Sequence, residues 1–330
     1  MGKKFDMLAL GEVLLRLSPE GNERLTQGTR FEKQLGGAEL NVAVGAANLG
    51  LTTGIISKIP SHAIGNYAKR EIRRNGVDTD YLAGDDSADS RLGIYYYEYG
   101  ADPRKPQVVY DRKYSSVNKL SLEDFPEEMY ENTRCFHTSG ITLGLGGPVR
   151  ENAIEMMKKF KEKGALISFD VNFRGNLWTG DEARDCITKI LPIVDIFFCS
   201  ESTANLTFGK TGDIKEILKK GQKLGFDGRV VTAGEGEAYE KLAEAAEGQV
   251  VYDRDFCGMA WEGRTQLAFT PVYQLSEAYS GESCEGKLAR LREKMKEKGA
   301  EIHYLTTLDD IAWLFNLRAD DVESCPVLLS

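Results

Sequence analysis

Long hydrophobic runs are absent from this chain of 330 residues, and no apolar stretch approaches the roughly 18 residues that span a bilayer. Residues 1–17 contain a short apolar run, but charges interrupt it and no small-residue cleavage site follows. We therefore expect a first strand at the N-terminus, no signal peptide and no membrane partner.

Histidine and cysteine are also scarce. The three histidines give little material for a histidine-rich metal site or a His-based catalytic triad, so we expect no metal ligands in the chain. The six cysteines are scattered and form no Cys-x-x-Cys pair, which is typical of a cytoplasmic protein with small buried thiols.

Positive charge is in the minority. The chain has 42 Lys and Arg against 51 Asp and Glu, a net charge of −9, and no basic stripe marks a nucleic-acid partner. Hydrophobic residues make up 42% of the chain, which is enough for a packed core. The length favours two domains.

Up to about residue 219, strand and helix patterns alternate. Short apolar runs predict buried parallel strands at 5–17, 54–59, 135–139, 165–171 and 194–199. Helical spacing of apolar residues predicts helices at 63–75, 149–163 and 181–190. The alternation favours an α/β layered fold with a mostly parallel central sheet. The aromatic-rich stretch at about 91–112 interrupts it and predicts two antiparallel strands of a small β lid.

Three clusters in this part could bind a ligand. Gly36-Gly37 opens an apolar helix, where glycines let a ligand approach the backbone, although a tight turn explains them equally well. Tyr95, Tyr110 and Arg112 suit a polyol and a carboxylate, although tyrosine is also favoured in strands generally. Residues 170–174 follow a predicted strand, where open α/β sheets bind ligands, although a capped loop is the alternative.

Several ordered motifs carry a resemblance to a known family. They are LGEVLLRLSP, GGAELNVAVGAANLG followed by Lys58, the Tyr110-x-Arg112 pair, Ser139-Gly140-Ile141 and FDVNFR. Over roughly residues 5–219 the chain resembles the PfkB/ribokinase family of sugar kinases, and within it the 2-keto-3-deoxygluconate kinases. The resemblance implies a ribokinase-like fold and ATP-dependent phosphorylation of 2-keto-3-deoxygluconate or a related sugar acid, with ATP and Mg²⁺ as cofactors.

The resemblance also assigns residues to two sides of one site. On the sugar side, seven residues would border the substrate, cover it, or hold its carboxylate and hydroxyls. They are Gly37, Asn41, Tyr95, Tyr110, Arg112, Ile141 and Arg174. The nucleotide side would comprise Asp170, Asn172 and Glu201. The last of these departs from the family, because Ser200-Glu201-Ser202-Thr203 stands where an Asn-x-x-Glu element is usual.

The family's catalytic base is missing from the sequence. Sugar kinases of this type carry an Asp in a Gly-Ala-Gly-Asp turn near the C-terminus, and no such turn occurs here. The nearest string is 232–238, TAGEGEA, whose Glu237 is a weak catalytic candidate because its neighbour Glu235 would repel a phosphate. The resemblance therefore predicts a kinase whose activity is impaired.

From about residue 221 to 330 the chain resembles a different family. The strings LGFDGRVV, AYSGES, KLARLREKMKEKGA and LTTLDDIAWLFNLR are similar to the non-catalytic N-terminal domains of creatinase-type Xaa-Pro aminopeptidases. The chain stops before the domain that carries that family's two-metal ligands, so we expect no peptidase site. Glycine at 299 should end one helix, 301–306 reads as a strand, Asp309 and Asp310 cap the next helix, and Trp313 lies in the core.

The chain thus reads as two joined segments, 1–219 from a sugar kinase and 220–330 from a truncated creatinase-type N-terminal segment. The leading hypothesis is a carbohydrate kinase. The alternatives are a sugar-acid binding protein without catalysis, and a peptidase-derived packing or oligomerisation module, so a homo-oligomer is conceivable.

Overall fold

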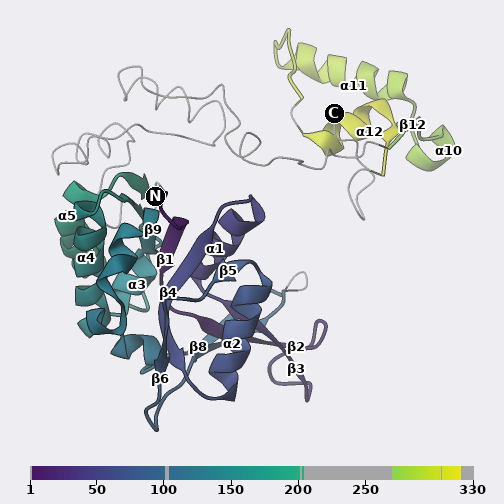
Figure 1. Ribbon diagram of the computed structural model, residues 1–330. Helices are drawn as coiled ribbons and strands as arrows, with labels where there is room; N and C mark the ends of the chain where they lie inside the picture. The colour runs from purple at the N-terminus through teal and green to yellow at the C-terminus, as the bar shows by residue number, and fades with distance from the viewer. Residues whose placement is uncertain (1, 101–103, 201–202, 204–269, 306, 321–330) are drawn as a thin grey trace. The chain divides into compact units, whose positions relative to one another are not determined.

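A computed structural model describes residues 2–100, 104–200, 203, 270–305 and 307–320 (Figure 1). The chain divides into two compact units, residues 1–262 and 263–330, which are described separately here. Among the described residues, no helix has the length and the apolar character that crossing a membrane requires.

The first unit is built on a central parallel sheet. Its strands follow the order β11-β10-β9-β1-β4-β5, and β6 pairs with β4. All described pairings in this sheet are parallel. The strands are β1 (Phe5–Leu10), β4 (Thr53–Pro60), β5 (Val77–Asp78), β6 (Leu82–Asp85), β9 (Thr133–Ser139), β10 (Leu166–Asp170) and β11 (Ile196–Phe198). The predicted α/β class with a mostly parallel sheet is confirmed.

Helices cover both faces of this sheet (Figure 1). One apolar cluster lies under α3 (Gly140–Gly144), α4 (Gly147–Glu162) and α5 (Gly180–Ile190). A second cluster lies under α1 (Ala38–Asn48) and α2 (Ala63–Arg74). Successive side chains of a strand point to opposite faces, and along β4 Ile55 belongs to the second cluster while Ile56 belongs to the first. A strand buried on both faces is continuously apolar, which is why these runs could be predicted.

The predicted first strand, 5–17, is wrong as a single element. The chain leaves the central sheet after β1, and the next strand, β2 (Leu14–Pro19), belongs to a second sheet of order β3-β2-β7-β8. We call these four strands the lid sheet; the others are β3 (Phe31–Gly36), β7 (Gly93–Glu98) and β8 (Gln107–Asp111). The antiparallel pair β7–β8 confirms the predicted ribbon, but the lid exceeds 91–112 because β2 and β3 add to it.

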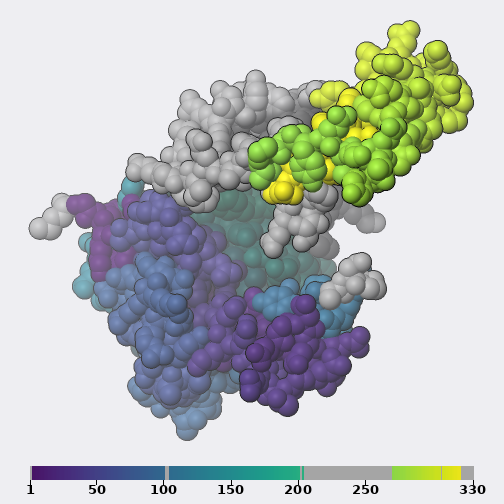
Figure 2. Space-filling model, turned by 90° about the vertical axis from the view of Figure 1, so that its right-hand side faces the viewer, coloured from purple at the N-terminus to yellow at the C-terminus, as the bar shows by residue number. Residues whose placement is uncertain are grey.

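All five residues of β8, at one edge of the lid sheet, are exposed, and so are the first four residues of the other edge strand, β3. The space-filling view shows the purple N-terminal residues, which include this strand, at the surface (Figure 2). The face of the lid that carries Leu15 and Ile94 packs on the apolar cluster beside α1 and α2. The lid is therefore fixed to the layered core by one face, and its other face is free to bound a cavity.

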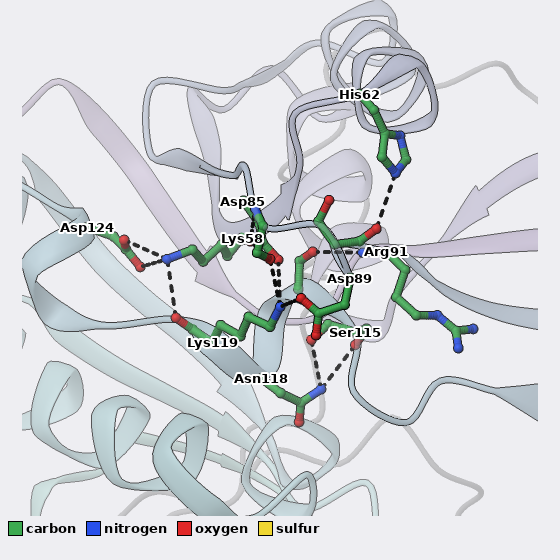
Figure 3. A network of polar contacts seen from close by, with 12 residues as sticks. Lys58, His62, Asp85, Asp89, Arg91, Ser115, Asn118, Lys119 and Asp124 are labelled. Atoms are coloured by element: carbon green, nitrogen blue, oxygen red, sulfur yellow. Dashed lines mark hydrogen bonds and ion pairs between the residues drawn. The ribbon is translucent and has the colours of Figure 1, made fainter.

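The segment that follows β8 is tied to the central sheet by a polar network (Figure 3). The Lys58 ammonium group, on β4, donates to both carboxylate oxygens of Asp124 at 2.8 and 3.0 Å and to the Lys119 carbonyl oxygen at 3.2 Å. Lys119 in turn donates to Asp89 at 2.6 Å and to Ser87 at 2.7 Å. These contacts hold the 3-10 turns η1 (Ser116–Lys119) and η2 (Leu122–Asp124) in place.

The second unit is small. Its described residues form a two-stranded antiparallel sheet, β12 (Tyr273–Gln274) with β13 (Leu317–Arg318), and the helices α10 (Glu277–Ser280), α11 (Cys284–Glu297) and α12 (Leu308–Phe315). The predicted helix end at Gly299 is confirmed, since this residue adopts φ +67° just after α11. The acids Asp309 and Asp310 lie in the first turn of α12, where the helix dipole favours them.

Two predictions for this unit are wrong. Residues 301–305 form no strand, and Ile302 and Tyr304 are each 85% exposed, because no neighbouring strand pairs with this segment among the described residues. Trp313 is 47% exposed and so is not a core residue. Its ring lies 4.5 Å from the Lys287 ammonium group, which is buried and also donates to the Trp313 carbonyl oxygen at 2.8 Å.

The Lys58 network yields a stability prediction. The side chains of Lys58 and Asp124 are only 15% and 20% exposed, so Lys58→Met should destabilise the first unit by about 3 kcal/mol by leaving a largely buried carboxylate unpaired. Urea unfolding followed by circular dichroism measures the loss. The matched control is Lys4→Met, which breaks an exposed ion pair with Asp80 and should cost less than about 1 kcal/mol. Equal losses would contradict the network's importance.

His137 yields a pH prediction. This residue of β9 is buried, and its Nδ1 lies 2.9 Å from the Ser168 hydroxyl on β10. Burial lowers the pKa of His137 from 6.5 to about 4. The folded protein therefore keeps the imidazole neutral while the unfolded chain takes up a proton below about pH 6.5, so stability falls as the pH drops from 6.5 towards 4.

The expected loss through His137 is about 2 kcal/mol between pH 7 and pH 5. Urea unfolding of the wild type and of His137→Gln at both pH values measures it as the difference between the two proteins. Burial raises the pKa of Glu12 and of Glu39, which acts in the opposite direction, but both proteins share this effect. An equal pH dependence in the variant would show that His137 does not titrate on unfolding.

Candidate functional site

A cavity of about 560 Å³ lies in the first unit under the free face of the lid sheet. Its walls come from the lid, the N-terminus of α1 and the segments that follow β1, β9 and β10. The structure brings nine of the predicted site residues to this one cavity: Gly37, Asn41, Tyr95, Tyr110, Arg112, Ile141, Asp170, Asn172 and Arg174. Glu201 and Glu237 lie outside the described residues, and their roles stay predictions.

The roof of the cavity follows from the two-residue period of the lid strands. Arg16 on β2 is in register with Tyr95 on β7, which is in register with Tyr110 on β8, so the three side chains lie in one row on one face. The Tyr95 and Tyr110 rings are 5.9 Å apart between centroids. Glycine at position 36 leaves room for the Tyr95 side chain, because a Cβ there would lie 2.6 Å from the Tyr95 hydroxyl oxygen. Arg16 was not anticipated from the sequence.

The second predicted glycine, Gly37, is required by the backbone. It adopts φ +142° immediately before α1, and a Cβ would lie 2.5 Å from the Glu12 carbonyl oxygen. The tight turn and the ligand site are therefore both compatible with this position. Asn41, one turn along α1, is exposed and forms part of the cavity wall.

A buried ion pair with Glu12 holds the side chain of Arg112, one of the predicted site residues. Its Nε donates to a carboxylate oxygen of Glu12 at 2.8 Å, its Nη2 contacts the same oxygen, and the Ser115 hydroxyl donates to the other oxygen at 2.5 Å. Burial raises the pKa of Glu12, and the guanidinium opposes that shift. Gly93 makes room for the pair, because a Cβ there would lie 2.4 Å from Glu12. Glu12 was missed, although a lone carboxylate in the apolar run ALGEVLL was a visible signal.

A second buried carboxylate, Glu39, joins α1 to the end of β9. Ser139 and Thr142 donate their hydroxyl hydrogens to it at 2.5 and 2.7 Å, and burial raises its pKa. The Ser139 hydroxyl also accepts from the Ile141 backbone N–H at 3.1 Å, which caps α3 and places Ile141 in the cavity wall. Glu39 fixes the floor of the cavity relative to α1. It was missed because an acid in the first turn of a helix is ordinary.

The end of β10 supplies the opposite wall. Asp170 accepts from the backbone N–H of Asn172 at 3.1 Å, and burial raises the pKa of this carboxyl group. Asn172 has φ +31°, so the chain turns sharply there, and Arg174 follows on the exposed rim. The predicted placement at the carboxyl end of a strand is confirmed. Lys58, by contrast, lies in the polar network and is no part of the cavity wall.

The described residues hold no group of three or more acidic, histidine or cysteine side chains that could bind a metal ion. Magnesium commonly uses one or two carboxylates together with substrate phosphates, so Asp170 alone would suffice only beside a nucleotide. The cavity instead combines aromatic faces, hydroxyls, amides and guanidinium groups with the carboxylates of Glu12, Glu39 and Asp170. That combination suits a small polyol that carries a carboxylate.

The chain is similar in sequence to known sugar-acid kinases. The chain is 32% identical to the 2-dehydro-3-deoxygalactonokinase of Haloferax volcanii over 285 residues, which are 86% of this chain and 87% of that protein. It is 29% identical to the 2-dehydro-3-deoxygluconokinase of Bacillus subtilis over 246 residues, which are 72% of this chain and 75% of that protein.

Solved structures of sugar kinases are also similar to this chain. The crystal structure of 2-dehydro-3-deoxygluconokinase from Thermotoga maritima superposes with a TM-score of 0.62 at 33% identity, covering 68% of this chain and 70% of that one. An uncharacterized sugar kinase of Pyrococcus horikoshii in complex with ATP has a TM-score of 0.55 at 26% identity, covering 61% and 65%.

Residues 263–330 match the Creatinase/Prolidase N-terminal domain, as the second resemblance predicted. The boundary predicted at 219–220 lies outside the described residues and stays a prediction. Residues 4–255 match the pfkB family carbohydrate kinase. With this match over most of its length, the chain belongs to the pfkB family of carbohydrate kinases.

Proposed function

We propose that this kinase acts on 2-keto-3-deoxygluconate or a related 3-deoxy-keto sugar acid. The supporting observation is the composition of one cavity, in which three tyrosines and three arginines meet three asparagines and three carboxylates. Relatives named as 2-dehydro-3-deoxygluconokinase and 2-dehydro-3-deoxygalactonokinase support the substrate class, since dehydro and keto describe the same carbonyl group.

Each predicted sugar-side residue has a role that its position allows. The rings of Tyr95 and Tyr110 would cover the carbon chain of the sugar, and their hydroxyls would bind its oxygens. Arg112 would donate its remaining N–H groups from a fixed orientation, because Glu12 holds the guanidinium by Nε and Nη2. Gly37 and Asn41 would border the opposite edge.

The nucleotide would approach from the end of β10. Members of this family use ATP, which supplies the phosphoryl group when bound. Asp170 and Asn172 fit that side because they offer a carboxylate and an amide at the rim of the sheet. Magnesium would be held there by Asp170 together with the nucleotide phosphates.

The proposed sugar-side residues all line one cavity, but the sequence lacks the Gly-Ala-Gly-Asp turn that supplies the family's base. Losing a general base costs roughly 100- to 10,000-fold, and losing a phosphate cradle costs a further factor of roughly 100 to 1,000. This contrast favours a second candidate function, a sugar-acid binding protein that turns over slowly or not at all.

The Glu12–Arg112 pair yields a binding prediction. Arg112→Ala should weaken binding of 2-keto-3-deoxygluconate by about 1.5–3 kcal/mol, the scale of a charged hydrogen bond. The single variant also leaves the buried Glu12 unpaired, which should lower stability by about 3–5 kcal/mol. The double variant Glu12→Gln, Arg112→Ala avoids that penalty. Calorimetry on both variants separates the two effects, and wild-type affinity in the double variant would remove Arg112 from the site.

The missing turn yields a turnover prediction. Phosphorylation of 2-keto-3-deoxygluconate by ATP, followed in a coupled assay, should be several orders of magnitude slower than in an intact family member even where the sugar binds. Glu237→Gln tests the one candidate base. Ordinary turnover abolished by this change would show that 232–238 replaces the missing turn, and ordinary turnover insensitive to it would mean that another residue acts as the base.

A further inference from the structure

Arg16 occupies the centre of the lid face that roofs the cavity. It lies in register with Tyr95, and its guanidinium carbon is 4.3 Å from the centroid of the Tyr97 ring and 5.1 Å from that of Tyr99. Its Nε donates to the Ser18 hydroxyl at 3.1 Å. Two aromatic rings and one hydroxyl therefore fix the direction of the guanidinium.

Arg16 differs from Arg112 in its charge balance. Arg112 is paired with the buried carboxylate of Glu12, so the two charges largely cancel within the wall of the cavity. Arg16 forms no ion pair within the part of the chain that the structure describes, and its neighbours there are neutral hydroxyls and rings. It is half-buried, so water screens its charge less than it would at an open surface.

A guanidinium has five N–H donors in a planar fork, and the bond to Ser18 uses only one of them. A planar fork that is stacked on tyrosine, half-buried and uncompensated is the arrangement that binds a carboxylate. We propose that Arg16 recognises the carboxylate of the sugar acid, whereas Arg112 serves its hydroxyls. This assignment rests on the proposed sugar-acid function and makes Arg16 a determinant of the preference for acids over neutral sugars.

The test compares two ligands that differ in one group. Calorimetry on the full chain measures the affinity for 2-keto-3-deoxygluconate and for 3-deoxyfructose, in which a neutral hydroxymethyl group replaces the carboxylate. Arg16→Gln should weaken binding of the acid roughly 10- to 100-fold, and should change binding of the neutral sugar less than about twofold. Arg112→Ala in the Glu12→Gln background should weaken both ligands.

Lys33→Gln is the matched control. Lys33 is a cation on β3 of the same sheet, but it is in register with Leu17, on the opposite face from Arg16, and contacts the Tyr67 ring at 4.2 Å. Removing this charge should leave both affinities within about twofold of the wild type. Arg16→Lys, which keeps the charge but loses the fork and the stacking, should weaken the acid roughly three- to tenfold and decides the question if Arg16→Gln does not fold.

Three outcomes overturn the proposal. Unchanged affinity for the acid in Arg16→Gln or Arg16→Lys would show that another group binds the carboxylate. Equal weakening of the acid and the neutral sugar would reduce Arg16 to a part of the lid's shape. A wild-type protein that binds neither ligand would contradict the proposed function itself, a result distinct from the first two because it appears before any substitution.

Discussion

The buried pair of Glu12 and Arg112 is the contact on which the site depends. Glu12 stands where the chain leaves the central sheet and enters the lid, and Arg112 stands where the chain leaves the lid again. One ion pair therefore joins the chain's first entry into the lid to its last exit from it. Arg112 and Ser115 offset part of the desolvation cost of Glu12, and Gly93 leaves the space that the pair fills. The orientation of the cavity roof follows from this geometry.

Much of the fold was visible in the sequence because the signal was local. Continuous apolar runs gave the central strands, and helical spacing gave α2, α4 and α5. The break within 5–17 was not visible, because the apolar pattern continues through Gly11 while the chain changes sheets. The strand predicted at 301–306 was wrong for a different reason. Residues 301–305 have strand propensity, but no strand pairs with them among the described residues.

Site residues that belong to a short sequence motif could be predicted. Site residues whose role depends on contacts between distant parts of the chain could not. Arg112 and Tyr110 were found through a short motif. Glu12 and Glu39 were not, because each acts on partners about 100 residues away, Ser115 and Ser139. Arg16 reads in sequence as one polar residue in an alternating strand, and its significance depends on the register between β2 and β7. Register is a property of the folded sheet and cannot be read from one strand alone.

The glycine at 93 has a consequence for how this protein can evolve. A side chain at position 93 would collide with Glu12 and press on Arg112. Substitutions at positions 12, 93 and 112 are therefore coupled, although 100 residues separate the first from the last. A change at one of the three is tolerated only when another compensates for it. The specificity of the cavity can therefore change through single substitutions at rim positions such as Asn41. The buried Glu12–Arg112 pair can change only when both residues, or one of them and Gly93, change together.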